Sequence, residues 1–257
     1  MKRSTDRILT THVGSLPRPA ELVELAAKNE GRLEGEPDVE DCLQRSITDV
    51  VHQQVDTGID IISDGEFGKF NWQGYVMRRI SGYETRQITP HRWSYIGQDL
   101  ETFEDFYRDS RPELFRPRNR WVCTGPLTYD DAQIRRDIAN FKTALRGVNV
   151  TDAFLPVVAP GSIAPDEANE YYPSEEAYVE AIANVLRQEY RAIVDAGFLL
   201  QVDDAILANL HDQLSEHGED NYLRWAELRI EGLNHALQGI PEDQVRYHIC
   251  WGSWHGP

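Results

Sequence analysis

Apolar residues recur at helical spacing in several parts of the chain, and the segment 174–196 is the clearest example. Its apolar positions fall on roughly one face of a helix, as expected for a helix that covers a sheet: Tyr178, Ala181, Ile182, Val185, Leu186, Ile193 and Val194. Ser174 is a suitable N-cap, and Gly197 suits the left-handed position that ends a helix. The pattern therefore predicts one helix from 174 to 196.

Two segments, 55–64 and 194–203, repeat one plan, in which a helix ends, a glycine follows, and a short apolar strand leads to an aspartate. This succession is typical of the repeating units of parallel α/β folds. Extended to the whole chain, the same reading predicts six strands, near 7–13, 59–63, 120–124, 154–158, 198–203 and 245–251. It predicts helices near 38–57, 131–145, 174–196 and 219–237.

These elements predict an α/β fold, a TIM-type (β/α)8 barrel truncated to about six βα units, with residues 1–257 as a single incomplete barrel domain. A doubly wound open sheet is the structural alternative, because six strands would also satisfy it. Against that alternative, the chain has no G-x-G-x-x-G or P-loop motif where a first βα turn would bind phosphate.

The segment 70–118 lacks clean periodicity and is rich in Arg, Tyr, Trp and Pro. Long loops in compact domains are often lids or binding loops. The segment is predicted to be a long excursion over the barrel mouth, with a short helix, a hairpin or both. Its aromatic residues either stack on a flat ligand or form the excursion's own core: Phe70, Trp72, Tyr75, Trp93 and Tyr95.

Charge and cysteine content restrict the partners and the location. The chain carries 26 Lys and Arg against 43 Asp and Glu, a net charge of −17. Such a surface repels phosphate backbones and anionic lipids, so neither a nucleic acid nor a membrane is an expected partner. Three widely spaced cysteines argue against a disulfide framework, and no segment fits a secretory signal or a membrane span. The predicted location is the cytoplasm.

His248 and Cys250 stand two residues apart at the end of the last predicted strand. Side chains at this spacing point to the same face of a strand, and an imidazole with a thiolate suits zinc. Any H-x-C sequence in a strand would qualify, however. Taken alone, the spacing is more typical of a buried cysteine beside a core histidine.

Carboxylates follow two of the predicted strands, at Asp64 and Glu66 and at Asp203 and Asp204. The carboxyl ends of barrel strands are where active sites are built, so these acids could bind an amino group, transfer protons or hold a metal. Loop solvation or helix capping is the alternative for each acid.

The first predicted strand leads into Val13-Gly-Ser15. The backbone N–H groups of Gly14 and Ser15 could face a substrate carboxylate. Taken alone, however, the segment is more typical of a simple tight turn, with His12 as a core histidine.

Four motifs in this order resemble the catalytic barrel of the cobalamin-independent methionine synthase family and its short single-barrel relatives. They are His12-Val-Gly-Ser15, Asp64-Gly-Glu66, Gln201-Val-Asp203-Asp204 and His248-Ile-Cys250, with support from Thr124-Gly-Pro-Leu-Thr128. The motifs span almost the whole chain, and their joint occurrence is far more specific than any one of them.

The resemblance implies a zinc-dependent enzyme that moves a methyl group from 5-methyltetrahydrofolate to the thiol of homocysteine, giving methionine. It implies that His248 and Cys250 are two of the Zn²⁺ ligands. Val13, Gly14 and Ser15 would hold the amino-acid end of homocysteine. Glu66 and Asp203, the candidate catalytic residues, would engage its ammonium group.

The sequence also departs from the family. The remaining zinc ligands and the proton donor would lie beyond Pro257, so weak zinc binding and poor turnover are expected of this chain. Ala132 stands about where the methionine synthases carry a tryptophan near the folate. Two alternatives therefore stay open: alkyl transfer to another small thiol, of the epoxide to coenzyme M type, or a non-catalytic barrel fragment. A homo-oligomer also stays open.

Overall fold

A parallel sheet forms the centre of the computed structural model. Its hydrogen-bonded strands follow the order β1 (Ile61–Ser63), β4 (Asp152–Val158), β5 (Leu199–Asp204) and β6 (Val245–Ile249). The structure describes residues 1–29, 32–33, 35–69, 74–88, 98–116, 118–163, 168–211 and 218–250.

The segment that precedes β1 extends this sheet by a single parallel bridge, between Thr11 and Ile61. The Asp60 carboxylate holds the segment in place by accepting hydrogen bonds from the Thr10 amide at 2.8 Å and from the Arg7 guanidinium. The predicted strand 7–13 is thus reduced to one bridge. The strands lie side by side in chain order with no reversal, as in a barrel and unlike a doubly wound sheet.

Four long helices connect the strands, and all four were predicted. They are α2 (Pro37–Asp56), α6 (Ala132–Ala144), α8 (Glu175–Asp195) and α10 (Glu219–Ala236). The Ser174 hydroxyl accepts a hydrogen bond from the Ala177 amide at 3.2 Å, so it caps α8 as expected. Gly197 follows α8 with φ +91°, the left-handed conformation that glycine adopts most easily. Outside the segment between β1 and β3, the described shorter helices are α1 (Ala20–Lys28), α7 (Pro160–Ile163) and the 3-10 turn η3 (Glu242–Gln244).

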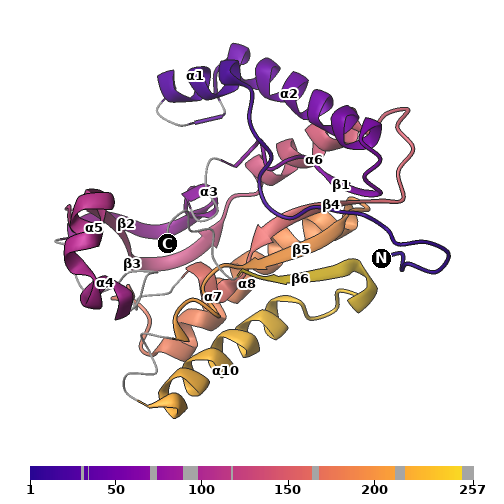
Figure 1. Cartoon of the computed structure of the whole chain (residues 1–257). Helices are drawn as coiled ribbons and strands as arrows, with labels where there is room; N and C mark the ends of the chain where they lie inside the picture. The colour runs from indigo at the N-terminus through magenta and orange to yellow at the C-terminus, as the bar shows by residue number, and fades with distance from the viewer. Residues whose placement is uncertain are drawn as a thin grey trace.

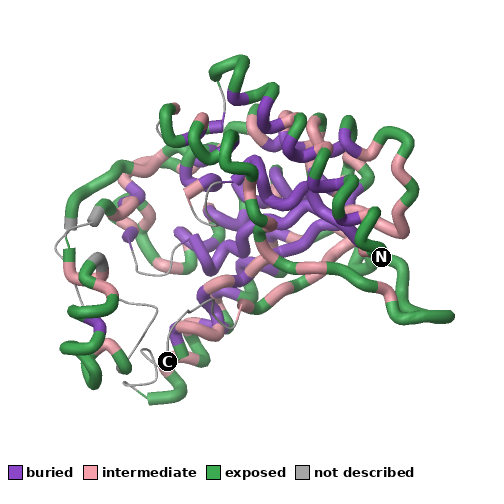
Figure 2. Tube along the Cα trace, turned by 45° about the horizontal axis from the view of Figure 1, so that its top comes forward, coloured by how far each residue is buried: buried purple, intermediate pink, exposed green. Residues whose placement is uncertain are grey.

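The two faces of the sheet have different environments (Figures 1 and 2). Successive strand residues face opposite sides. One set packs in the main core with the helices: Ile62, Leu155, Val157, Leu200 and Val202. The alternate set forms a small cluster on the inner face with Leu9: Ile61, Phe154 and Leu199. Helices that cover one face and a separate cluster on the other are the arrangement of a barrel wall.

A two-stranded antiparallel sheet, β2 (Ile80–Ile88) with β3 (Arg118–Tyr129), stands apart from the parallel sheet. The predicted barrel strand 120–124 lies within β3, so its assignment to the parallel sheet was wrong. The apolar run identified a strand but not its partner, because pairing is decided by distant residues. Gly82 permits the close approach of the two strands, since a Cβ there would lie 2.6 Å from the Pro126 carbonyl oxygen.

Strand β2 lies in the predicted excursion, 70–118, whereas its partner β3 begins only where that range ends. This excursion contains helices as well as β2: α3 (Gly74–Met77), α4 (Gln98–Thr102), α5 (Glu104–Ser110) and the 3-10 turn η1 (Pro112–Phe115). Figure 1 shows β2, β3, α4 and α5 grouped together at one end of the molecule. Of its predicted stacking aromatics, Phe70, Trp72, Trp93 and Tyr95 lie outside the described residues. No helix in the described ranges is long and apolar enough to cross a bilayer.

Candidate active site at the carboxyl ends of the strands

The turn after β1 holds Glu66 in an unusual backbone conformation. Gly65 has φ +70° and Glu66 has φ +59°, a region that residues with a side chain rarely adopt. The Asp64 carboxylate accepts a hydrogen bond from the Glu66 amide at 2.9 Å, and the Ser63 hydroxyl accepts one from the Gly65 amide at 3.1 Å. These bonds fix the turn and direct the Glu66 side chain.

The segment that contains Val13, Gly14 and Ser15 packs against this turn. The Ser15 hydroxyl donates a hydrogen bond to the Glu66 carboxylate at 3.0 Å, and the Leu16 amide donates to the Gly65 carbonyl oxygen at 3.1 Å. Gly14 has φ +82°, and Val13 is exposed. The structure therefore brings the first predicted motif next to the second.

Asp203 and His248 face each other across β5 and β6. They are register partners, and the His248 Nδ1 atom lies 3.0 Å from an Asp203 carboxylate oxygen. The Gln201 amide donates to the same oxygen at 2.8 Å. Burial raises the pKa of Asp203 and the neighbouring Glu66 carboxylate raises it further, while the hydrogen bond with His248 acts in the opposite direction. The two acids are thus electrostatically coupled.

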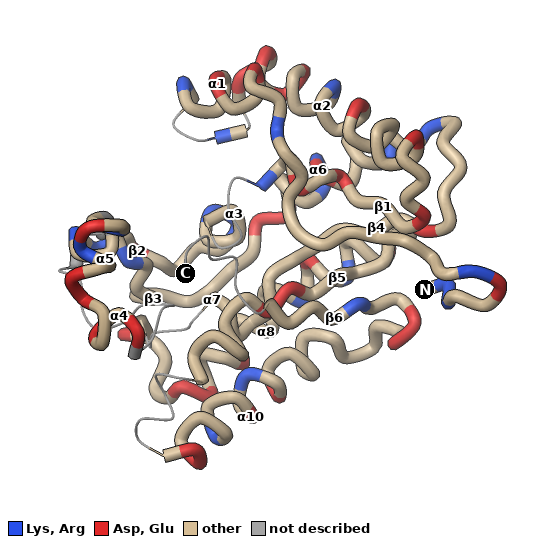
Figure 3. The backbone as a smooth tube through the Cα atoms, in the orientation of Figure 1, with Lys and Arg blue, Asp and Glu red and all other residues tan. Residues whose placement is uncertain are grey.

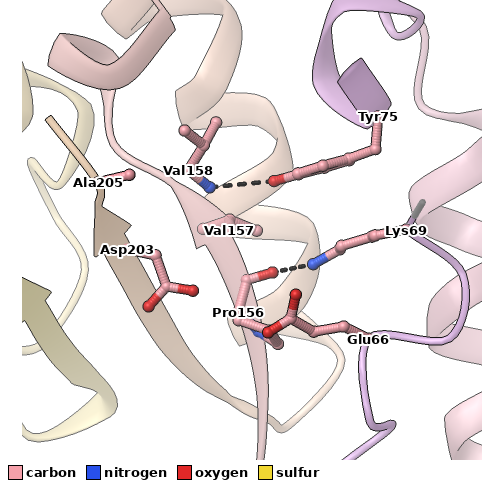
Figure 4. Close-up of a pocket in the computed structure, with 8 residues that line it drawn as sticks. All are labelled: Glu66, Lys69, Tyr75, Pro156, Val157, Val158, Asp203 and Ala205. Atoms are coloured by element: carbon pink, nitrogen blue, oxygen red, sulfur yellow. Dashed lines mark hydrogen bonds between the residues drawn. The ribbon is translucent and has the colours of Figure 1, made fainter. Parts of the chain in front are cut away.

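Glu66 and Asp203 line one small cavity of about 30 Å³ between β4, β5 and the turn after β1 (Figure 4). Its other walls come from Lys69, Tyr75, Ala205 and the end of β4: Pro156, Val157 and Val158. This volume holds about two water molecules, so the cavity fits a charged end group better than a whole substrate. The Tyr75 hydroxyl accepts a hydrogen bond from the Val158 amide at 3.0 Å, which closes one side.

Two of the four predicted acids stand outside the cavity wall. Asp204 accepts hydrogen bonds from the Ser162 hydroxyl at 3.0 Å and from the Leu207 amide at 3.1 Å, so it caps the turn after β5. Asp64 is buried behind the Glu66 turn, and burial raises its pKa to about 6. The capping alternative holds for Asp204, whereas Asp64 shapes the site from behind.

The predicted metal donors lie at the end of β6. His248 is on the inner face, where its Nδ1 atom contacts Asp203, and this leaves Nε2 available as a ligand atom. A histidine ligand held by a carboxylate through its other ring nitrogen is the usual arrangement in metal sites. Cys250 has a free, partly exposed thiol, two positions further along the strand direction. The two donors fit zinc, although within the described ranges no three His, Cys, Asp or Glu residues form a metal-holding group.

Sequence reasoning missed Lys69 as a cavity residue. Its side chain is only 3% exposed, and it stands three positions after Glu66. Tyr75 was predicted only as an aromatic of the excursion, with no link to the acids. A cation that closely follows an acid pair was the one signal that could have identified Lys69.

Away from this cavity, the positions of charged residues are distributed over the outer elements (Figure 3). Acidic positions occur along α1, α2 and α10, with basic positions between them. In these described helices, acidic and basic positions are therefore interspersed along the chain.

Comparisons with known proteins agree with the motifs. Residues 8–98 match the family model of the cobalamin-independent synthase catalytic domain. A methionine synthase from Sulfolobus acidocaldarius is 23% identical over 246 residues, which cover 95% of this chain and 62% of the relative. One from Thermococcus kodakarensis is 23% identical over 250 residues, which cover 96% of this chain and 62% of the relative. The chain thus spans less than two thirds of the length of these curated relatives.

Solved structures show the same fold. A putative vitamin-B12-independent methionine synthase from Listeria monocytogenes superimposes with a TM-score of 0.68 at 21% identity, covering 96% of this chain and 67% of that one. A B12-independent methionine synthase from Shewanella sp. W3-18-1, in complex with selenomethionine, gives 0.65 at 17% identity, covering 95% and 61%. The predicted barrel-type α/β fold is confirmed. The motifs, the match of residues 8–98 to the family model and the sequence relatives all support membership of the cobalamin-independent methionine synthase family.

Proposed function

We propose that this chain carries the thiol-binding part of a methyltransferase site that moves a methyl group from 5-methyltetrahydrofolate to homocysteine. The observation that carries the proposal is the contact between Asp203 and His248, because it connects a cavity acid to a predicted metal donor. The family relatives named methionine synthase support the same reaction. A cytoplasmic location goes with the proposal, since reduced thiols persist there.

Glu66 and Asp203 would bind the ammonium group of the amino acid. Both carboxylates line the cavity, and their mutual repulsion is relieved when a cation lies between them. Ser15 orients Glu66 through its hydroxyl group, and the strained turn holds the Glu66 backbone. These residues would bind and orient the substrate without touching the sulfur atom.

His248 and Cys250 would hold zinc, with Asp203 fixing the orientation of the imidazole. When bound, zinc lowers the pKa of a coordinated thiol, so that the sulfur is a nucleophile near neutral pH. The sulfur would form a bond to the methyl carbon as the bond from that carbon to the folate nitrogen breaks. The thiol gives up one proton and the departing amine takes up one, so the transfer is balanced.

Alkyl transfer to another small thiol is the second candidate. Ala132, the first residue of α6, offers no aromatic ring at the place where methionine synthases are expected to carry a tryptophan. This difference concerns the electrophile, and the acid pair and the metal donors are the same in both candidates.

Methionine formation tests the proposal. The chain is incubated with Zn²⁺, homocysteine and 5-methyltetrahydrofolate triglutamate, and the product is measured by mass spectrometry. We expect slow methionine formation that falls at least about 100-fold in Cys250→Ala, because a lost ligand disables the metal. Cys42→Ala, which changes a buried thiol in α2, is the matched control and retains activity.

The same assay separates the alternatives. Methionine formation that persists in Cys250→Ala would contradict the role of the thiol. Alkylation of 2-mercaptoethanesulfonate by an epoxide, without any methionine formation, would favour the second candidate. The absence of both reactions would support a non-catalytic fragment.

A further inference from the structure

Lys69 is a buried cation in the cavity wall that the reaction described above does not use. Its side chain is 3% exposed, and its ammonium group donates to the Pro156 carbonyl oxygen and lies 4.8 Å from the centre of the Tyr75 ring. Among the described residues, no carboxylate oxygen forms an ion pair with it within 4.0 Å. The charge of Lys69 lowers the pKa of the buried Asp64, so that acid balances it in part from behind the cavity. A buried cation without a close ion-pair partner, in the wall of a cavity, can still bind a ligand of opposite charge.

The backbone around Lys69 is built to direct this side chain. The Arg18 guanidinium donates to the carbonyl oxygens of Glu66, at 2.8 Å, and of Lys69. The Lys69 amide donates to the Glu66 carbonyl oxygen at 3.0 Å. Gly68 packs so close to Asp137 that a Cβ would lie 2.8 Å from its carboxylate oxygen. Lys69 is therefore held in place by contacts on several sides.

The cavity joins this cation with two acids. Lys69, Glu66 and Asp203 all line it, and Figure 4 shows the Lys69 nitrogen on the Pro156 carbonyl oxygen beside Glu66. Two carboxylates with one ammonium complement a group that carries a positive and a negative charge on neighbouring atoms. Ser15 has a single O–H, and it is already donated to Glu66, so the hydroxyl is not free to donate to a ligand carboxylate. A lysine ammonium has three N–H groups and can supply that donor.

We propose that Lys69 is a specificity-determining residue, whose ammonium binds the carboxylate of an α-amino-acid thiol while Glu66 and Asp203 bind its ammonium. The inference rests on the proposed function, since it concerns the same thiol substrate. It makes the site selective for zwitterionic thiols over thiols that carry only a negative charge.

Isothermal titration of two thiols that differ only in the carboxylate tests this inference. L-homocysteine has the carboxylate, and 3-amino-1-propanethiol lacks it. We expect Lys69→Met to weaken homocysteine binding about 10- to 100-fold, as loss of a charge-assisted hydrogen bond does. Binding of the aminothiol should change by less than about twofold, because that ligand has no group for Lys69 to bind.

Two further variants complete the experiment. Lys69→Arg keeps the charge and should restore part of the preference for homocysteine. Lys142→Met removes an exposed cation from α6 and should leave both affinities unchanged. Retained aminothiol binding by Lys69→Met shows that the acid pair, and therefore the fold of the site, is intact.

Each remaining outcome overturns a definite claim. Equal losses for both ligands would make Lys69 a purely structural residue. Unchanged homocysteine binding in Lys69→Met would contradict the inference and leave the proposed function standing. If the unmodified chain binds 2-mercaptoethanesulfonate but not homocysteine, the proposed function itself fails.

Discussion

Glu66 is placed in the cavity by a backbone conformation that costs stability. Its φ of +59° is unfavourable for a residue with a side chain, and three neighbouring groups hold it: the Asp64 carboxylate, the Ser15 hydroxyl and the Arg18 guanidinium. Strained residues of this kind persist where the surrounding structure determines them fully. A glycine would fit the turn better, but it would remove the carboxylate that the cavity needs.

A comparison of Glu66→Gly with Glu66→Ala separates the strain from the side chain. Both variants lose the carboxylate and its hydrogen bond with Ser15, but only glycine relieves the positive φ. We expect Glu66→Gly to be more stable than Glu66→Ala by about 1 kcal/mol. Urea denaturation measures the difference in the free energy of unfolding. Both variants should lose homocysteine binding, because both lack the carboxylate. Equal stability of the two variants would show that the turn is not strained.

At the scale of elements, a buried ion cluster connects the hairpin to the helices of the barrel wall. Arg79, just before β2, pairs with Asp137 of α6 and with Glu189 of α8, the latter at 2.6 Å. Burial lowers the pKa of Arg79, but the charges of Glu189 and Asp137 outweigh it and raise the pKa above its ordinary value. The guanidinium also lies 4.8 Å from the centre of the Tyr75 ring. The cluster thus connects the barrel wall to a residue of the cavity.

Arg79→Leu should destabilise the fold by about 3–5 kcal/mol, because it leaves two buried carboxylates without their cation. The free energy of unfolding in urea measures this loss. Arg86→Leu is the matched control on the same hairpin, since Arg86 pairs with Glu84 and Glu170 at the surface and should cost little. Similar losses in the two variants would mean that burial of the cluster does not determine its contribution.

The elements that the sequence predicted correctly have local causes. The bounds of α8 follow from its apolar face, the Ser174 cap and Gly197, which are all encoded within one segment. The pairing of 120–124 could not be predicted, because nothing local distinguishes an antiparallel partner from a parallel one. Glu66 and Asp203 were predicted at one edge because the carboxyl ends of parallel strands meet there, and the family resemblance added His248. Lys69 was missed because the turn geometry, rather than a strand, places it.

At the scale of the whole molecule, β6 is an edge strand within the described residues. It pairs with β5 alone, and its outward side chains Tyr247 and Ile249 are exposed. The exposed Leu223 and Ile230 of α10 lie on the same side of that helix, seven residues apart. An unpaired strand edge with apolar side chains favours pairing with the same strand of another copy. The prediction of a homo-oligomer, still untested, is most naturally attached to this edge.

Ile249→Lys should therefore reduce self-association. Ile249 is 48% exposed, and its side chain points away from His248, so a lysine there would leave the cavity intact while placing a charge on the edge. Sedimentation velocity over a range of protein concentrations measures the effect, with the unmodified chain showing concentration-dependent association and the variant shifted toward monomer. Phe103→Lys, which changes an apolar residue 56% exposed between α4 and α5, is the control and should not alter the distribution. If both substitutions reduce association equally, the contact is non-specific and apolar. If the unmodified chain is a monomer, the free edge of β6 does not pair with a second copy.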